Sequence, residues 1–259
     1  MTVNANKTVR ELAVELTSAT RVFEKLGIDY CCGGHRTLTE ACEVAKVPVS
    51  AAVASLEVAE SIVSETRVAK DWSREPLSEL IDHIVKTHHA FVRQELPRIE
   101  ALLTKVLSKH GTGHPELSGV DTIFAALQQE LNMHLMKEEQ ILFPYIVRLE
   151  EAKIAGEPVP PAMFGSVQHP ISMMEQEHDG AGEAFRRMHE LTDNFAVPAS
   201  ACMSYQELYR ALPAFEADLH QHIHLENNIL HPRAVAMEGG RVSQGDFKCS
   251  PEQCCVTEK

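Results

Sequence analysis

Two stretches of this chain have nearly the same sequence: His134-Leu-Met-Lys-Glu138-Glu-Gln-Ile-Leu-Phe-Pro144 and His222-Ile-His-Leu-Glu226-Asn-Asn-Ile-Leu-His-Pro232. Both contain a histidine, a glutamate four residues later, an Ile-Leu pair and a final proline. A further histidine precedes each copy at nearly the same distance, His89 by 45 residues and His178 by 44. The chain therefore carries a unit of the form His…His-x-x-x-Glu twice.

The region around the repeats has the pattern of a helical bundle. Apolar residues recur at spacings of three and four, and strand-type alternation is absent. This pattern predicts four long helices, separated by segments rich in Gly and Pro, at 77–109, 118–152, 170–194 and 204–236. We therefore expect an all-α fold, an up-down-up-down four-helix bundle. Four prolines are expected to kink or stop these helices: Pro97, Pro144, Pro213 and Pro232.

The repeat predicts a metal site in the bundle. Residues four apart lie on one face of a helix, so each copy presents an imidazole and a carboxylate to the same side. Burying these groups without compensation would be costly, and coordination of two metal ions compensates all of them. Imidazole with carboxylate suits iron, manganese or zinc, and bridging carboxylates favour iron. The predicted ligands are His89, His134, Glu138, His178, His222 and Glu226.

Other polar residues near the repeat are assigned different roles. Glu130 and Glu177 are candidates to orient the ligand histidines, although a solvated helix glutamate explains each of them equally well. Gly182, one turn after His178, leaves space for a small ligand, and helix packing is the alternative explanation. The remaining histidines are expected to lie on other helix faces, at the surface or in loops: His83, His88, His110, His114, His169, His189, His220, His224 and His231.

The N-terminal part, residues 1–70, reads as a small helical domain. Thr8-x-x-Glu11 and Thr37-x-x-Glu40 are capping boxes, and the first helix should run to Gly27. Cys31 and Cys32 then form a Cys-Cys-Gly-Gly turn. A nearby helix N-terminus would favour their thiolates, although a tight turn with buried sulfur is an equal alternative.

Two further regions complete the domain organisation. Residues 77–236 form the bundle, and residues 237–259 are expected to be a flexible tail. The tail carries three cysteines without a fourth ligand, which is weak evidence for a metal site: Cys249, Cys254 and Cys255.

Composition restricts the class of partner and the compartment. The chain has 24 basic and 37 acidic residues, a net charge of −13, which argues against nucleic acid and anionic lipid as partners. It has no apolar run of membrane-spanning length and no apolar signal core at its start. Seven cysteines form a poor disulfide framework and indicate a reducing compartment, so a cytoplasmic location is expected.

These motifs together resemble the RIC (repair of iron centres) branch of the hemerythrin-like superfamily. The resemblance rests on the Asp29–Gly34 turn, both copies of the repeat and Glu177-His178-Asp179. It implies a cysteine-bearing N-terminal domain and a non-haem di-iron centre with the same six ligands. It also implies a cytoplasmic protein, as a monomer or a homodimer.

The resemblance implies repair of iron–sulfur clusters damaged by oxidative or nitrosative stress. The partners would be damaged iron–sulfur proteins or scaffolds, and small ligands such as nitric oxide or oxygen. One alternative is an oxygen or nitric oxide sensor, or an iron store, without repair activity. A bundle stapled by structural metal is a further alternative. Whether the protein is an enzyme stays open.

Overall fold

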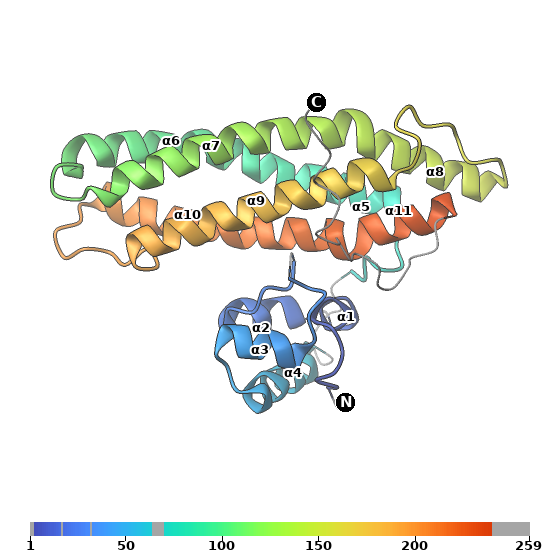
Figure 1. Ribbon diagram of the computed structural model, residues 1–259, viewed down its shortest axis with the longest axis horizontal. Coiled ribbons are helices and arrows are strands. Elements are labelled where there is room, and N and C mark those ends of the chain that lie inside the picture. Colours follow the sequence, from blue (N-terminus) through green and yellow to red (C-terminus); the bar gives the residue numbers. More distant parts are fainter. Residues whose placement is uncertain (1–2, 17, 32, 64–69, 240–259) are drawn as a thin grey trace, which may run out of the picture.

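The four helices expected in the bundle are present, and three of them contain a π-helical segment. The structure is a computed structural model that describes residues 3–16, 18–31, 33–63 and 70–239. The bundle consists of α5 (Leu77–Ile84), η1 (Val85–His89) and α6 (Ala90–His110), then α7 (Glu116–Lys137), η2 (Glu138–Leu142) and α8 (Phe143–Ala155), then α9 (Gln168–Thr192), and finally α10 (Met203–His224), η3 (Leu225–Leu230) and α11 (His231–Glu238). No strand occurs among the described residues, so the predicted all-α class is confirmed. Figure 1 shows these helices as a long bundle.

The bundle prolines do not stop their helices, so of the two expected effects, a kink or a stop, only the kink stays a prediction. Pro97 and Pro213 lie inside α6 and α10, which continue past them. Pro144 and Pro232 follow directly after η2 and η3, in the first turns of α8 and α11. A proline removes one helical hydrogen bond and pushes the preceding turn outward, and a widened π-helical turn accommodates this displacement.

The apolar core of the bundle is divided in two along its length. One cluster lies between α6, α7, α9 and α10, and includes Leu96, Phe124 and Phe215. The other lies between α5, α8, the start of α9 and the η3–α11 region, and includes Ile146 and Leu230. The predicted metal ligands lie where one cluster gives way to the other along the helices, for example His89 between Ile84 and Val92, and His178 between Met174 and Ala181. The candidate site is therefore a polar layer between two apolar cores.

The N-terminal unit is a small helical body with its own core. It consists of α1 (Val9–Glu15), α2 (Ala19–Leu26), α3 (Leu38–Ala45) and α4 (Val49–Val63). Both predicted capping boxes are confirmed at the starts of α1 and α3. The single helix expected up to Gly27 is wrong, because two helices form. The backbone of Leu16 is extended, which ends α1 before α2 begins. The Ser18 hydroxyl, between the two helices, donates a hydrogen bond to Glu60 on α4.

Tyr30 attaches the N-terminal unit to the bundle. Its hydroxyl accepts a hydrogen bond from Gln221 Nε2 at 2.8 Å, and its carbonyl accepts one from Asn228 Nδ2 at 2.9 Å. Ile223 of α10 belongs to the apolar core of the N-terminal unit. In Figure 1 this unit, in blue, lies along one side of the bundle. The Cys31 turn is consequently held against α10.

No helix in the described part of the chain is long and apolar enough to cross a bilayer. The tail expected to be flexible lies outside the described residues from 240 onward, and so do its three cysteines.

We predict that Glu150→Ala lowers the free energy of unfolding by about 1–2 kcal/mol. Pro76 has no side chain that can cap α5, and the buried Glu150 carboxylate accepts hydrogen bonds from the amides of Leu77 at 2.6 Å and Ser78 at 2.9 Å instead. Burial opposes ionisation, but these amides lower the pKa of Glu150 below its usual value. The contribution is therefore complete above the unfolded-state pKa and is lost as the pH falls.

Urea unfolding of the two variants Glu150→Ala and Glu151→Ala measures this effect. Glu151 is exposed and should change stability by less than about 0.5 kcal/mol. Equal stability of the two variants would contradict the capping role.

Candidate metal centre

The structure brings the six predicted ligands together in the polar layer. All six are buried, with at most 3% of any residue exposed. They form two groups of four whose ligand atoms lie within 4.8 Å of one another, and both groups contain Glu138 and Glu226. The first group adds His89 and His222, and the second adds His134 and His178. The arrangement offers two neighbouring cation positions with two shared carboxylates.

The distances within each group suit a shared cation. The Nε2 atoms of His89 and His222 are 3.1 Å apart, and those of His134 and His178 are 3.0 Å apart. Glu226 Oε1 lies 3.0 Å from His222 Nε2, and its Oε2 lies 3.2 Å from His178 Nε2. Atoms bound to one metal at about 2.1 Å are neighbours at about this spacing.

Unpaired oxygens in the layer test whether cations fit. Both carboxylate oxygens of Glu138 and Oε2 of Glu226 are fully buried and have no hydrogen-bond partner among the described residues. The 3.2 Å contact between Glu226 Oε2 and His178 lacks hydrogen-bond geometry. A buried carboxylate without partners is costly, and a metal ion supplies the missing partner. The residues present therefore fit a centre with two metals.

Burial and mutual charge alter the proton affinities of the site. Burial and the nearby charge of Glu226 raise the pKa of Glu138. Burial opposes the protonation of His178, but the close contact and the negative charge of Glu226 raise its pKa to about 9. Burial lowers the pKa of the other three histidines, His89, His134 and His222. These three are therefore neutral near pH 7, as ligation requires.

Three of the four histidines are oriented through their second ring nitrogen. Glu139 lies 2.6 Å from Nδ1 of His89, and Asn227 lies 2.9 Å from Nδ1 of His178. Glu139 and Asn227 directly follow Glu138 and Glu226, so they are equivalent positions of the repeat. Both were missed from the sequence, although the repeat itself marks them. A partner of this kind fixes the tautomer and the orientation of a ligating imidazole.

Glu177 orients the third of these histidines, as one of the two sequence hypotheses for it stated. Its carboxylate lies 2.9 Å from Nδ1 of His134 and also contacts Lys137. Glu130, the other candidate, is exposed and makes no hydrogen bond to His134. The structure thus distinguishes two glutamates that the sequence treated alike.

Three histidines assigned to other faces or to the surface are in fact buried. His231 is 1% exposed, His224 5% and His88 7%. His88 meets Asp218 at 3.0 Å and belongs to neither group of four, in line with its expected direction. The surface or loop assignment of His231 is wrong. This residue occupies the place of Phe143 in the repeat, so the same helix face turns it into the core.

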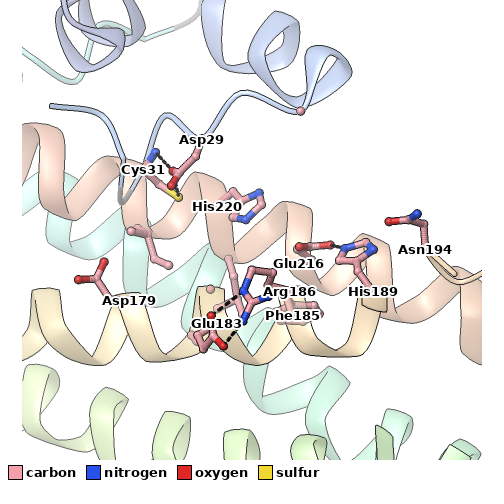
Figure 2. A pocket seen from close by; sticks show the side chains of 15 residues that line it. Asp29, Cys31, Asp179, Glu183, Phe185, Arg186, His189, Asn194, Glu216 and His220 are labelled. Atoms are coloured by element: carbon pink, nitrogen blue, oxygen red, sulfur yellow. Dashed lines mark hydrogen bonds and ion pairs between the residues drawn. The ribbon is translucent and has the colours of Figure 1, made fainter. Parts of the chain in front are cut away.

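The Cys31 turn borders a cavity of about 590 Å³ between the N-terminal unit and the bundle. Figure 2 shows Asp29, Cys31 and His220 at one part of it, with Asp179 and Glu183 of α9 opposite. The Cys31 thiol is buried and lies 3.5 Å from Asp29 Oδ1 as a hydrogen-bond donor. The expected helix N-terminus is not its neighbour, because α3 begins only at Leu38. Cys32 lies outside the described residues.

Gly182 is another of the residues that line this cavity. No atom of a neighbouring residue lies within 4 Å of where its Cβ would be. This open space faces a cavity whose lining includes none of the six predicted ligands, so the expected space for a small ligand at the metal stays a prediction.

The fold and the buried groups define a hemerythrin-type cation-binding bundle. Residues 80–234 match the family described as Hemerythrin HHE cation binding domain, and residues 5–60 match a Domain of Unknown function, DUF542. The proteins named Iron-sulfur cluster repair protein YtfE from Citrobacter koseri and Escherichia coli O157:H7 are each 38% identical to this chain over 228 residues, 88% of this chain and 96% of the relative. The protein of that name from Escherichia fergusonii is 37% identical over the same length.

The chain belongs to the RIC family of hemerythrin-like proteins. Its cofactor is a non-haem di-iron centre.

We predict that the affinity of the metal-free protein for ferrous iron rises with pH between pH 6 and 9. The raised pKa values of Glu138 and His178 mean that metal must displace protons from these groups. Affinity should gain about tenfold per pH unit for each proton displaced, and level off near pH 9. Anaerobic calorimetry in buffers of different ionisation enthalpy measures both the affinity and the protons released. Binding that is independent of pH and releases no protons would contradict the prediction.

We predict that Glu177→Gln weakens metal binding by about 10- to 100-fold, because His134 loses an anionic partner at Nδ1. Glu130→Gln is the matched control, since Glu130 lies one helical turn before His134 and makes no hydrogen bond to it. This variant should leave the metal affinity within about twofold of that of the unmodified protein. Competition with a chromogenic chelator measures both. Equal losses in the two variants would refute the selective role of Glu177.

Proposed function

We propose that His89, His134, Glu138, His178, His222 and Glu226 hold the two irons, and that this centre serves in repair of damaged iron–sulfur clusters. The observation that carries the assignment is the pair of overlapping four-residue groups, buried and sharing two carboxylates. The relatives that match 88% of the chain bear the name of iron–sulfur cluster repair proteins, which supports the proposed activity.

Each residue has a defined task in this proposal. Glu138 and Glu226 each present two oxygens, so each can span both positions. The histidines present Nε2 to the metals, while Glu139, Glu177 and Asn227 hold three of their rings in place through Nδ1. The bound irons supply redox chemistry and exchangeable iron. The two apolar cores on either side exclude bulk water from the layer.

The cavity beside Cys31 is a candidate place for a client group to approach the protein, although none of the six ligands lines it. Asp29 and Asp179 add carboxylates to its lining, Glu183 is ion-paired there with Arg186, and Cys31 adds a thiol. We propose Cys31, together with Cys32, as a contact to iron or to client proteins. Since Cys31 is only 3% exposed, a client group has to enter the cavity to reach it.

We also propose a compartment, small ligands and clients for this activity. A reducing, cytoplasmic compartment suits an odd set of seven cysteines. Oxidative and nitrosative stress damage iron–sulfur clusters, so nitric oxide or oxygen are proposed as small ligands of the centre. The clients are proposed to be iron–sulfur proteins with damaged clusters.

The test is recovery of a client enzyme. A dehydratase whose [4Fe–4S] cluster has been damaged by peroxide is incubated anaerobically with the iron-loaded protein. We predict that activity returns faster than with the same amount of free ferrous iron. Glu226→Ala, which removes a shared carboxylate, should abolish the gain together with iron binding.

The control is Glu151→Ala, which changes an exposed glutamate far from the centre and should repair like the unmodified protein. Recovery no better than with free iron would refute the repair function. Reversible binding of nitric oxide or oxygen without client recovery would favour a sensor or an iron store.

A further inference from the structure

His231 corresponds to Phe143 in the repeat, so the second copy has a polar ring where the first copy has an apolar one. Phe143 packs on His89 with ring centroids 5.7 Å apart and planes at 20°, and His231 packs on His178 at 6.3 Å and 5°. Both side chains are buried, with 2% and 1% exposed. The apolar ring of Phe143 is sufficient to pack against a ligand histidine. Packing alone therefore does not explain why a polar ring stands at His231.

The polar atoms of His231 therefore need another explanation. Both of its ring nitrogens are buried and have no hydrogen-bond partner among the described residues. Two unpaired polar atoms in a protein interior cost free energy that a phenylalanine would not cost. This cost indicates that the imidazole interacts with something that binds beside it.

The surroundings of His231 locate that partner. The charged and titratable groups that act on it are Glu226, His178, His134 and Arg10. Three of these belong to the second group of four, and His231 packs on the ring of His178, so it adjoins this metal position rather than the one of His89 and His222. It is not a member of that group, whose ligand atoms lie within 4.8 Å of one another.

We propose that His231 hydrogen-bonds a small ligand bound at the metal position of His134 and His178, and so makes this position the one that accepts exogenous ligands. The ligand class is a molecule of one to three heavy atoms with a hydrogen-bonding atom, such as water or a small linear anion. At the other position Phe143 offers only carbon. The inference rests on the ligand assignment proposed above.

Azide binding to the diferric, full-length protein tests the inference. Azide is a three-atom anion whose binding to ferric iron gives a charge-transfer band. We expect His231→Phe to retain two irons per chain and to bind azide about tenfold more weakly, the effect of one lost hydrogen bond. His231→Gln keeps a donor and an acceptor and should stay within about threefold of the unmodified protein.

Phe143→Leu is the matched comparison, because it alters the equivalent ring over His89 without touching a hydrogen-bonding atom, so it measures the effect of packing alone and should lower azide affinity less than His231→Phe does. Unchanged affinity in His231→Phe, or equal losses in His231→Phe and His231→Gln, would assign a packing role and overturn the inference. The iron count of each variant separates this outcome from failure of the ligand assignment, because a wrong assignment would leave two irons bound in Glu226→Ala.

Discussion

Two carboxylates buried between two apolar cores determine how this bundle is built. Glu138 and Glu226 are both fully buried, and three of their four oxygens lack a hydrogen-bond partner among the described residues. A carboxylate in this environment either takes up a proton or binds a cation. Burial and the charge of Glu226 raise the pKa of Glu138, which favours the first response. Four imidazoles on the same layer make the second response available.

The π-helical segments coincide with the layer of buried ligands. η1 ends at His89, η2 begins at Glu138, and η3 contains Glu226. Each extra residue in a widened turn changes the phase of the next helical turns, so a helix can aim polar residues into the layer and then return its apolar residues to the second core. Pro144 and Pro232 then begin regular helix again at a point where a missing amide is tolerated. The Ile-Leu-x-Pro part of the repeat thus encodes the return to the core.

The sequence was sufficient for the bundle and for the six residues of the layer because both follow from periodicity. A helix face is a local property, and two copies of one pattern fix which residues share it. The break at Leu16 was not predictable in this way, because it depends on the contact of Ser18 with Glu60 in a distant helix. The choice of Glu177 over Glu130 likewise depends on the packing of α9 beside α7. His231 was missed for a different reason: its equivalence to the buried Phe143 was visible in the repeat but was not used.

The two halves of the bundle agree at the ligands and differ in the residues that touch them. In the repeat, Glu139 corresponds to Asn227, Phe143 to His231, and His88 to Glu177. Each of these residues contacts a ligand histidine, by a hydrogen bond or by ring packing. His89 therefore has a carboxylate partner where His178 has a neutral amide. Each position has one histidine with a carboxylate partner, His89 with Glu139 and His134 with Glu177, and they differ in the second histidine, since His178 has Asn227 and Nδ1 of His222 has no partner among the described residues. Since partners at the second ring nitrogen tune how strongly an imidazole donates to metal, the surroundings of the two positions are unequal although their ligands are alike.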